Sequence, residues 1–322
     1  MSYSILDLLF SFLKWYLASY ITIRIGKCLW ILINSIKGHF FTKPYDLSSY
    51  INNWAVVTGA TDGIGKAYIN ELAKSRGIKK FFLIGRSLKK LEDIKKYMED
   101  TYKAQVEFYV FDFASDDLNK LDSIIEKLDV GILINCAGTG PSEVANFVEL
   151  PKGQGSQILK VNLMSTVKMV ELVLPKMVEK DHGIIVNFAS ATSWRPLPYM
   201  STYPSSKAGI SFFTSTLVDE FKNTNVKIQL LIPLLVATKI AFYEKEESNN
   251  IFVVDPEEYA RQAVNTIGNF PLSTGCFQHD VQLALATLIG FNIFKLFFVP
   301  IVMLRVHKKR VAGYIERKGK RE

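Results

Sequence analysis

The sequence predicts one doubly wound α/β domain, a parallel sheet with helices on both faces, with an apolar segment at either end. Between residues 51 and 280, short runs of β-branched and aromatic residues alternate with longer amphipathic runs. This alternation is typical of parallel strands joined by crossover helices. At 322 residues and 48% hydrophobic content the chain can bury a sizeable core. We expect residues 1–50 to form a membrane anchor and linker, 51–280 the folded domain, and 281–322 an apolar, membrane-associated segment with a basic tail.

The strands are expected wherever a short run of Val, Ile, Leu or Phe is bounded by glycine or polar residues. These runs are Ala55–Thr58, Lys80–Gly85, Val106–Phe111, Gly131–Asn135, Gly183–Ser190 and Val226–Ile232, with a last strand near Cys276–Asp280.

The helices are expected between the strands, where apolar residues recur every three or four positions. These segments are Ile64–Ser75, Leu88–Tyr102, Asp116–Leu128, Gly155–Val178, Ser205–Lys222 and Pro256–Ile267.

The N-terminal apolar stretch predicts a membrane anchor. Leu8–Ile23 contains one charge, Lys14, so a tilted span is favoured over a helix lying in the interface. A cleaved signal peptide is disfavoured, because no basic region precedes the stretch and no small-residue cleavage site follows it. Arg24 and Lys27 follow the apolar run, and the positive-inside bias places them and the rest of the chain in the cytosol.

The C-terminal apolar stretch, Val281–Leu304, is equally consistent with a buried or interfacial helix and with a second span. Arg305–Arg310 is basic and suits contact with lipid headgroups. Lys318 and Lys320 resemble the dilysine signal that retrieves membrane proteins to the endoplasmic reticulum. The predicted location is therefore the endoplasmic reticulum membrane, with the domain facing the cytosol.

The net charge of +8 lies at the two ends of the chain. Residues 1–50 carry five Lys or Arg against two Asp, and residues 305–322 carry eight against two Glu, so the chain between them is left with −1. This distribution suits a lipid surface and argues against nucleic-acid binding. The cysteines and histidines are scattered, so neither disulfides nor a metal site is expected. They are Cys28, Cys136, Cys276, His39, His182, His279 and His307.

A glycine-rich loop follows the first strand and leads into a helix. Gly59, Gly63 and Gly65 let the backbone turn sharply and approach a pyrophosphate at the helix N-terminus, which predicts a Rossmann-like dinucleotide site. The segment TGATDGIG resembles the TGxxxGIG pattern of the short-chain dehydrogenase/reductase family at every fixed position.

The end of the second strand predicts NADPH as the cofactor. Phe81–Leu91 contains no acidic residue that would hold the ribose 2′-hydroxyl of NAD, and Arg86 directly follows Gly85. Arg86 would pair with the 2′-phosphate; the alternative is that it is a solvated loop charge. Asp112 resembles the family's aspartate beside the adenine ring.

A catalytic set is predicted around Tyr203 and Lys207. The two lie four apart at the start of a helical pattern and so share one face, and Ser190 lies at the carboxyl end of a predicted strand. With Asn162 they resemble the family's Asn-Ser-Tyr-Lys tetrad. Reduction of a ketone needs a hydride on carbon and a proton on oxygen. We expect Tyr203 to donate the proton, Lys207 to lower its pKa, and Ser190 to bind the carbonyl oxygen.

The resemblance implies further roles. Lys207 would hold the nicotinamide ribose, and Asn162 would hold a water that links Lys207 to solvent. The family usually reads NNAG after the fourth strand, whereas this chain reads Asn135-Cys-Ala-Gly138. We expect Cys136 to be a buried small hydrophobic residue rather than a redox switch, with a modest effect on stability.

The complete set of expected site residues combines these motifs with Pro233–Thr238, which resembles the segment that covers the cofactor in the family. The catalytic residues are Asn162, Ser190, Tyr203 and Lys207; Ser190 and Tyr203 also bind substrate; the cofactor residues are Thr58, Gly59, Thr61, Asp62, Gly63, Ile64, Gly65, Arg86, Asp112, Asn135, Ala137, Gly138, Tyr203, Lys207, Pro233, Val236 and Thr238.

The substrate is expected to be a lipid ketone. The apolar N-terminus, FDFAS, LLIPLLVATK and the basic tail resemble the microsomal 17β-hydroxysteroid dehydrogenases and very-long-chain 3-oxoacyl-CoA reductases. A 3-oxoacyl-CoA of fatty-acid elongation is preferred, and a steroid or another lipid ketone is the alternative. A non-catalytic scaffold is a third reading, disfavoured because such relatives lose the tyrosine or serine. The loop 239–254 is the expected substrate lid, and the family implies a homodimer through residues 155–178 and 205–222.

Overall fold

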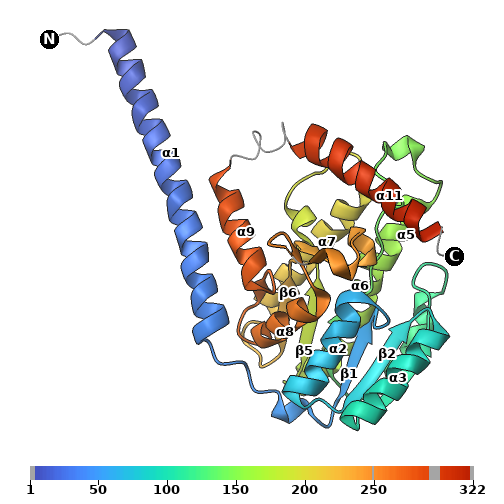
Figure 1. The fold of residues 1–322 in the computed structure, drawn as a ribbon. Coiled ribbons are helices and arrows are strands. Elements are labelled where there is room, and N and C mark those ends of the chain that lie inside the picture. The colour runs from blue at the N-terminus through green and yellow to red at the C-terminus, as the bar shows by residue number, and fades with distance from the viewer. Residues whose placement is uncertain (1–3, 249, 290–297, 320–322) are drawn as a thin grey trace.

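The core of the molecule is a seven-stranded, all-parallel sheet (Figure 1). The computed structural model describes residues 4–248, 250–289 and 298–319. The strand order is β3-β2-β1-β4-β5-β6-β9, so the winding direction reverses between β1 and β4, where doubly wound sheets bind their ligands. The doubly wound, Rossmann-like fold is confirmed. The strands are β1 Trp54–Thr58, β2 Lys80–Gly85, β3 Gln105–Val110, β4 Val130–Asn135, β5 Ile184–Phe188, β6 Lys227–Leu231 and β9 Leu272–Ser273; β7 Leu235–Val236 and β8 Val253–Val254 pair separately.

Helices cover both faces of the sheet, and each face has its own hydrophobic core. Successive residues of a strand point to opposite faces, so Val57 packs with α2, α3 and α8, whereas Val56 packs with α4 and α6. The helices of the domain are α2 Gly63–Arg76, α3 Leu88–Tyr102, α4 Asp122–Ile125, α5 Gln154–Leu159, α6 Ser165–Glu179, α7 Thr202–Glu220, α8 Pro256–Thr266 and α9 Phe277–Leu288.

Three element predictions need correction. The last strand is not at Cys276–Asp280, because Gly275 turns the chain with φ +93° and α9 begins at Phe277; β9 lies just before this turn. The segment 116–128 is mostly not α-helix: a 3₁₀ turn at Leu118–Leu121 precedes the four-residue α4. The helix predicted over 155–178 is interrupted by a π-helical turn, Lys160–Met164, a feature that is frequent at functional sites.

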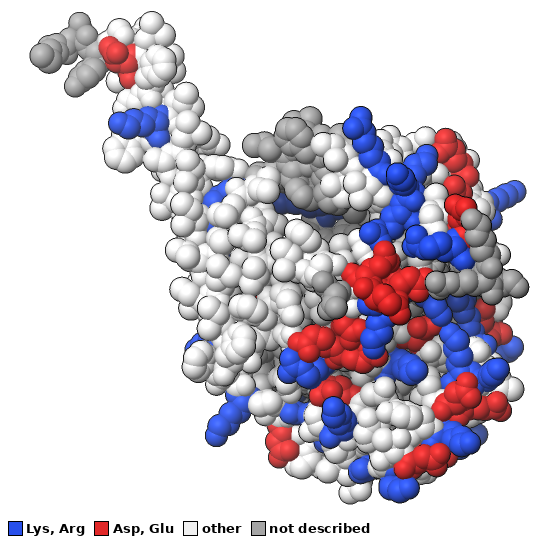
Figure 2. Space-filling model, in the orientation of Figure 1, with Lys and Arg blue, Asp and Glu red and all other residues white. Residues whose placement is uncertain are grey.

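The N-terminal helix α1, Ile5–Ile36, projects from the domain at one end and packs along α9 at the other (Figure 1). Its 32 residues span roughly 48 Å at 1.5 Å per residue, which exceeds the about 30 Å of a bilayer core. The helical segment Ile5–Phe41 is long and apolar enough to cross a membrane, and 6% of its most apolar window is buried. In Figure 2 the surface over α1 and over the adjoining left part of the domain carries few charged side chains, whereas Lys, Arg, Asp and Glu gather over the right and lower parts.

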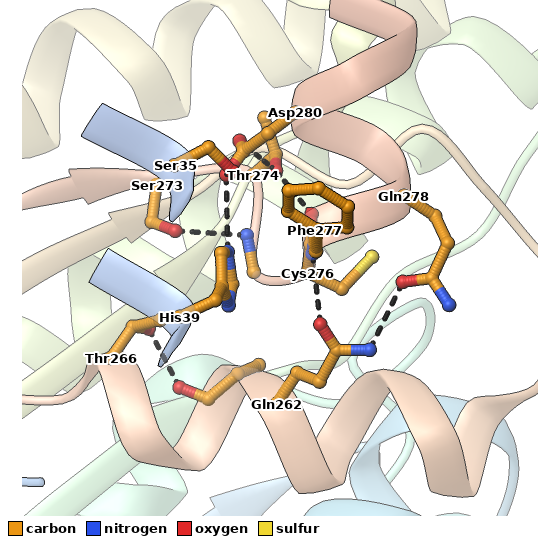
Figure 3. A network of polar contacts seen from close by, with 12 residues as sticks. Ser35, His39, Gln262, Thr266, Ser273, Thr274, Cys276, Phe277, Gln278 and Asp280 are labelled. Atoms are coloured by element: carbon orange, nitrogen blue, oxygen red, sulfur yellow. Dashed lines mark hydrogen bonds and ion pairs between the residues drawn. The ribbon is translucent and has the colours of Figure 1, made fainter. Parts of the chain in front are cut away.

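A polar network joins the end of α1 to α9 (Figure 3). The carboxylate of Asp280 accepts hydrogen bonds from Ser35 Oγ at 2.7 Å and from Thr274 Oγ1 at 2.5 Å, and it lies 3.1 Å from His39 Nε2. About two turns along α9, Arg24 donates to the carbonyl oxygens of Thr287 and Ile289. Polar contacts therefore fix α1 to α9 at two levels.

The C-terminal segment packs over the expected lid. A π-helical segment, Phe298–His307, continues into α11, Lys308–Gly319; residues 290–297, in the middle of the second apolar stretch, and Lys320 lie outside the described residues. Met303 and Val311 form a small core with Val144 and Phe242. Arg310, expected at lipid headgroups, pairs with Glu247 at 2.8 Å and lies over the ring of Tyr243.

Candidate active site

One large cavity of about 1350 Å³ lies at the carboxyl ends of the central strands. A pocket for one drug-sized ligand usually measures about 300–1,000 Å³, so this cavity is large for a single ligand. Most of the predicted site residues line it. They are Gly59, Thr61, Asp62, Gly63, Ile64, Arg86, Asp112, Ala137, Gly138, Ser190, Tyr203, Lys207, Pro233, Val236 and Thr238.

Four predicted residues, Thr58, Gly65, Asn135 and Asn162, lie behind the cavity wall rather than in it. Thr58 is buried, and its Oγ1 accepts a hydrogen bond from Ala137 N at 3.1 Å. These residues support the wall.

The glycine loop can admit a pyrophosphate because its backbone is packed too closely for side chains. Gly59 has φ +67°, and a Cβ there would lie 2.8 Å from backbone atoms of Cys136 and Ala137. A Cβ at Gly65 would lie 2.4 Å from the carbonyl oxygen of Gly59. The loop ends at the N-terminus of α2, where unpaired N–H groups and the helix dipole favour an anion. The residues present therefore fit a dinucleotide.

Asp62, at the start of α2, is neutralised by two lysines. Its side chain accepts from Gly63 N at 3.0 Å and pairs with Lys90 at 3.0 Å and with Lys239. Burial opposes ionisation of Asp62, but the hydrogen bonds from Lys239 and Lys90 outweigh it, and the pKa is lowered. Arg86 is exposed at the rim of the same cavity. Cations therefore surround this end of the site.

The side chains predicted to be catalytic, Ser190, Tyr203 and Lys207, all line the cavity. Tyr203 and Lys207 share one face of the first turns of α7, and Lys207 Nζ lies 5.9 Å from the centre of the Tyr203 ring. Lys207 Nζ donates to the carbonyl oxygen of Phe188 at 2.8 Å, which ties it to the end of β5. Ser190 follows β5, and its hydroxyl is hydrogen-bonded to Tyr203.

The ionisation of this set differs from the sequence-based expectation. Burial raises the pKa of Tyr203, and the hydrogen bond with Ser190 opposes the rise only in part. Lys207 was expected to lower the pKa of Tyr203, but in the structure this pKa is raised, because burial has the largest effect on it. Burial also lowers the pKa of Lys207 to about 8. Tyr203 therefore keeps its proton at neutral pH, as a proton donor must.

Asn162 braces the site. Its Oδ1 accepts from Thr139 N at 2.8 Å, and its Nδ2 donates to Thr139 O at 3.0 Å and to Ser206 Oγ at 2.9 Å. Its own carbonyl oxygen accepts from Thr166 Oγ1 at 2.8 Å. These groups are thus engaged with protein atoms, and Asn162 joins the loop after β4 to α7 from within the π-helical turn.

The segment expected to cover the cofactor, Pro233–Thr238, is held by His279, a residue that the sequence analysis did not assign to the site. Leu234 N donates to His279 Nδ1 at 3.3 Å, and Nε2 lies 3.2 Å from Leu235 O. Burial lowers the pKa of His279 to about 4, so the imidazole is neutral at physiological pH. His279 therefore positions the segment that contains Val236 and Thr238.

Two further residues were missed. Asn187 accepts from Asn135 Nδ2 at 2.9 Å and donates to Thr214 at 3.0 Å, which braces β4 against β5 and α7. Thr192 lines the cavity beside Ser190, and its Oγ1 is buried with no hydrogen-bond partner among the described residues. An unpaired hydroxyl there could bind a polar substrate atom. No spacing in the sequence signals either role.

Cys136 behaves as a buried neutral thiol. Burial raises its pKa to about 12, and the side chain packs against the hydrophobic core that contains Val57. A thiol reacts chiefly as the thiolate, so the structure favours the packing role that the sequence predicts over a redox switch.

Comparisons with known proteins agree with this geometry. Residues 53–249 match the family model described as short chain dehydrogenase. The Caenorhabditis elegans "Uncharacterized oxidoreductase dhs-27" is 50% identical over 187 residues, which span 58% of this chain and 23% of that protein. "Very-long-chain 3-oxoacyl-CoA reductase-B" of Danio rerio is 36% identical over 79% of this chain and 81% of its own length. A solved short-chain dehydrogenase from Sphingobium yanoikuyae, in complex with NADPH, is 24% identical with a TM-score of 0.60, over 66% of this chain and 84% of that one.

Proposed function

Because the chain belongs to the short-chain dehydrogenase family, we propose that it is a membrane-anchored enzyme that reduces a 3-oxoacyl-CoA to the 3-hydroxyacyl-CoA with NADPH. Oxidoreductase activity follows from the family. The observation that carries the proposal is the meeting of Ser190, Tyr203 and Lys207 in a large cavity beside the glycine loop. Relatives named very-long-chain 3-oxoacyl-CoA reductases, matched over about four-fifths of their length, support the acyl-CoA.

The side chains divide the chemistry among them. A nicotinamide held beside the glycine loop would supply the hydride to the carbonyl carbon. Ser190 donates a hydrogen bond to the carbonyl oxygen and stabilises the charge that develops there. Tyr203, held protonated by burial, gives that oxygen its proton. Lys207 presents its ammonium group between Phe188 and the Tyr203 ring, where it can hold the nicotinamide ribose hydroxyls.

The direct test is NADPH oxidation by membranes that carry the protein, offered a 3-oxoacyl-CoA and a 17-ketosteroid side by side. Turnover of the 3-oxoacyl-CoA alone supports the proposal. Turnover of the steroid alone would show that the substrate is a steroid and not an acyl-CoA, while the proposed ketone reduction would stand. If neither compound is reduced, the enzyme proposal fails and the non-catalytic scaffold is the alternative that remains.

Arg86 is proposed to select NADPH. We expect Arg86→Asp to lower kcat/KM for NADPH by about 10–100-fold, because one charge-assisted contact is worth about 1.5–3 kcal/mol, and to leave NADH nearly unaffected. Lys89→Asp is the matched control: it makes the same charge change at the second residue of α3, outside the cavity lining. An unchanged preference in Arg86→Asp would remove Arg86 from the cofactor site.

The rate of reduction should fall in alkaline solution. The pKa of Lys207 is lowered to about 8, so the ammonium is present below pH 8 and lost above it. If its charge is needed, kcat/KM is flat from about pH 6 to 7.5 and then declines toward about tenfold per pH unit. Initial rates across this range, with unfolding followed at each pH, check the profile. A rate constant that stays level to pH 10 would show that the charge is not required.

A further inference from the structure

The cavity extends well past the catalytic side chains, along α9 and the C-terminal segment. We propose that this extension, the tail lobe, binds the acyl chain of the substrate and opens beside α1. The tail lobe is defined by Leu283, Ala286, Thr287, Val302, Met303 and Val306. The inference rests on the proposed function and names the part of the substrate that this unassigned site takes.

One face of α9 builds the inner wall of the tail lobe. His279, Leu283 and Ala286 are spaced four and three residues apart, so they lie on one side of the helix. At one end of this face His279 supports the segment that covers the cofactor, and further along Leu283 and Ala286 line the cavity. The lobe is therefore continuous with the nicotinamide end of the site.

The walls of the tail lobe suit a hydrocarbon chain. Five of its six residues are aliphatic or Met, and none is charged. Arg310, which also lines the cavity, is already paired with Glu247 and packed over Tyr243. The six lobe residues offer no cation to a phosphate-bearing group, whereas burial of methylene groups contributes about 0.8 kcal/mol each.

The cavity reaches the membrane-spanning candidate helix, where we place its opening. Tyr20, Ile23, Arg24 and Lys27 of α1 line the same cavity. Carbonyls at the C-terminus of a helix are normally unpaired and would repel an apolar ligand. Arg24 satisfies two of them by donating to Thr287 O and Ile289 O. The mouth is thus formed by an apolar helix whose arginine covers the polar end of α9, so an acyl chain can enter from the bilayer.

The test compares two tryptophan substitutions on α9. Leu283→Trp fills the tail lobe. Leu285→Trp is the control, since Leu285 is 54% exposed and outside the cavity lining. The full-length protein in detergent micelles is assayed with 3-oxobutanoyl-CoA, whose chain is too short to reach the lobe, and with 3-oxohexadecanoyl-CoA. We expect Leu283→Trp to lower the ratio of kcat/KM for the long over the short substrate by tenfold or more, and Leu285→Trp to leave the ratio unchanged.

Each other outcome overturns a distinct statement. If the wild type reduces the long substrate and Leu283→Trp keeps the wild-type ratio while still binding NADPH, the tail lobe is wrong and the proposed function stands. Ala286→Phe provides a second obstruction should Leu283→Trp fail to fold, and a wild-type ratio in that variant has the same meaning. If the wild type reduces no 3-oxoacyl-CoA of either length, the proposed function fails and the lobe assignment fails with it.

Discussion

Replacement of Tyr203 by Phe is expected to lower NADPH-dependent reduction about a thousandfold, within the range that general acid catalysis contributes. The substitution removes one oxygen atom, the one that Ser190 contacts and that burial keeps protonated. The ring remains beside Lys207, so NADPH binding should be preserved. Single-turnover rates and NADPH fluorescence on binding separate the two effects.

Tyr199→Phe is the matched control for this change. Tyr199 lies four residues away and outside the cavity lining, and it packs against the small core under the C-terminal segment. The control should turn over at close to the wild-type rate. Full activity in Tyr203→Phe would assign the proton to another group.

Gly59→Ala should be strongly damaging, because it combines a left-handed backbone conformation with a clash against backbone atoms. At φ +67° an alanine costs about 1–2 kcal/mol, and its Cβ would lie 2.8 Å from the backbone of Cys136 and Ala137. The backbone of Cys136 and Ala137 cannot move aside without disturbing the sheet. We therefore expect the free energy of unfolding to fall by roughly 3 kcal/mol or more and NADPH binding to be lost. Denaturant unfolding and NADPH titration measure the two losses.

Gly77→Ala isolates the conformational part of that cost. Gly77 ends α2 with φ +71°, and a Cβ there meets no atom within 4 Å. Its destabilisation should stay near the left-handed cost alone, with NADPH affinity unchanged. Equal losses in the two variants would contradict the close packing of the glycine loop.

The sequence was sufficient for elements whose signals are local. The helix Leu88–Tyr102 has the predicted ends, because its amphipathic pattern begins and ends at those residues. In the structure Lys103 is left-handed and ends the helix. The strand near residue 276 was misplaced because the apolar character of Cys276 and Phe277 suits a strand and a buried helix equally, and the turn at Gly275 decided between them.

The candidate site shows the same division. Gly59, Ser190, Tyr203 and Lys207 lie on recognisable spacings, and the structure brings them to one cavity. His279 depends on packing between segments 44 and 45 residues apart, which no spacing encodes. The direction of the Tyr203 pKa shift likewise depends on how deeply the ring is buried, which the sequence pattern does not contain.

The helix α9 is constrained on two sides within two turns. His279 faces the cofactor-covering segment, and Asp280, one residue and about 100° further round the helix, faces Ser35 and His39 of the N-terminal segment. With Arg24 bonded to the C-terminal end of the helix, α9 can neither roll about its axis nor slide along it without breaking hydrogen bonds. The wall of the tail lobe that α9 forms is therefore held at three points. We expect its shape to be the same with and without a bound ligand.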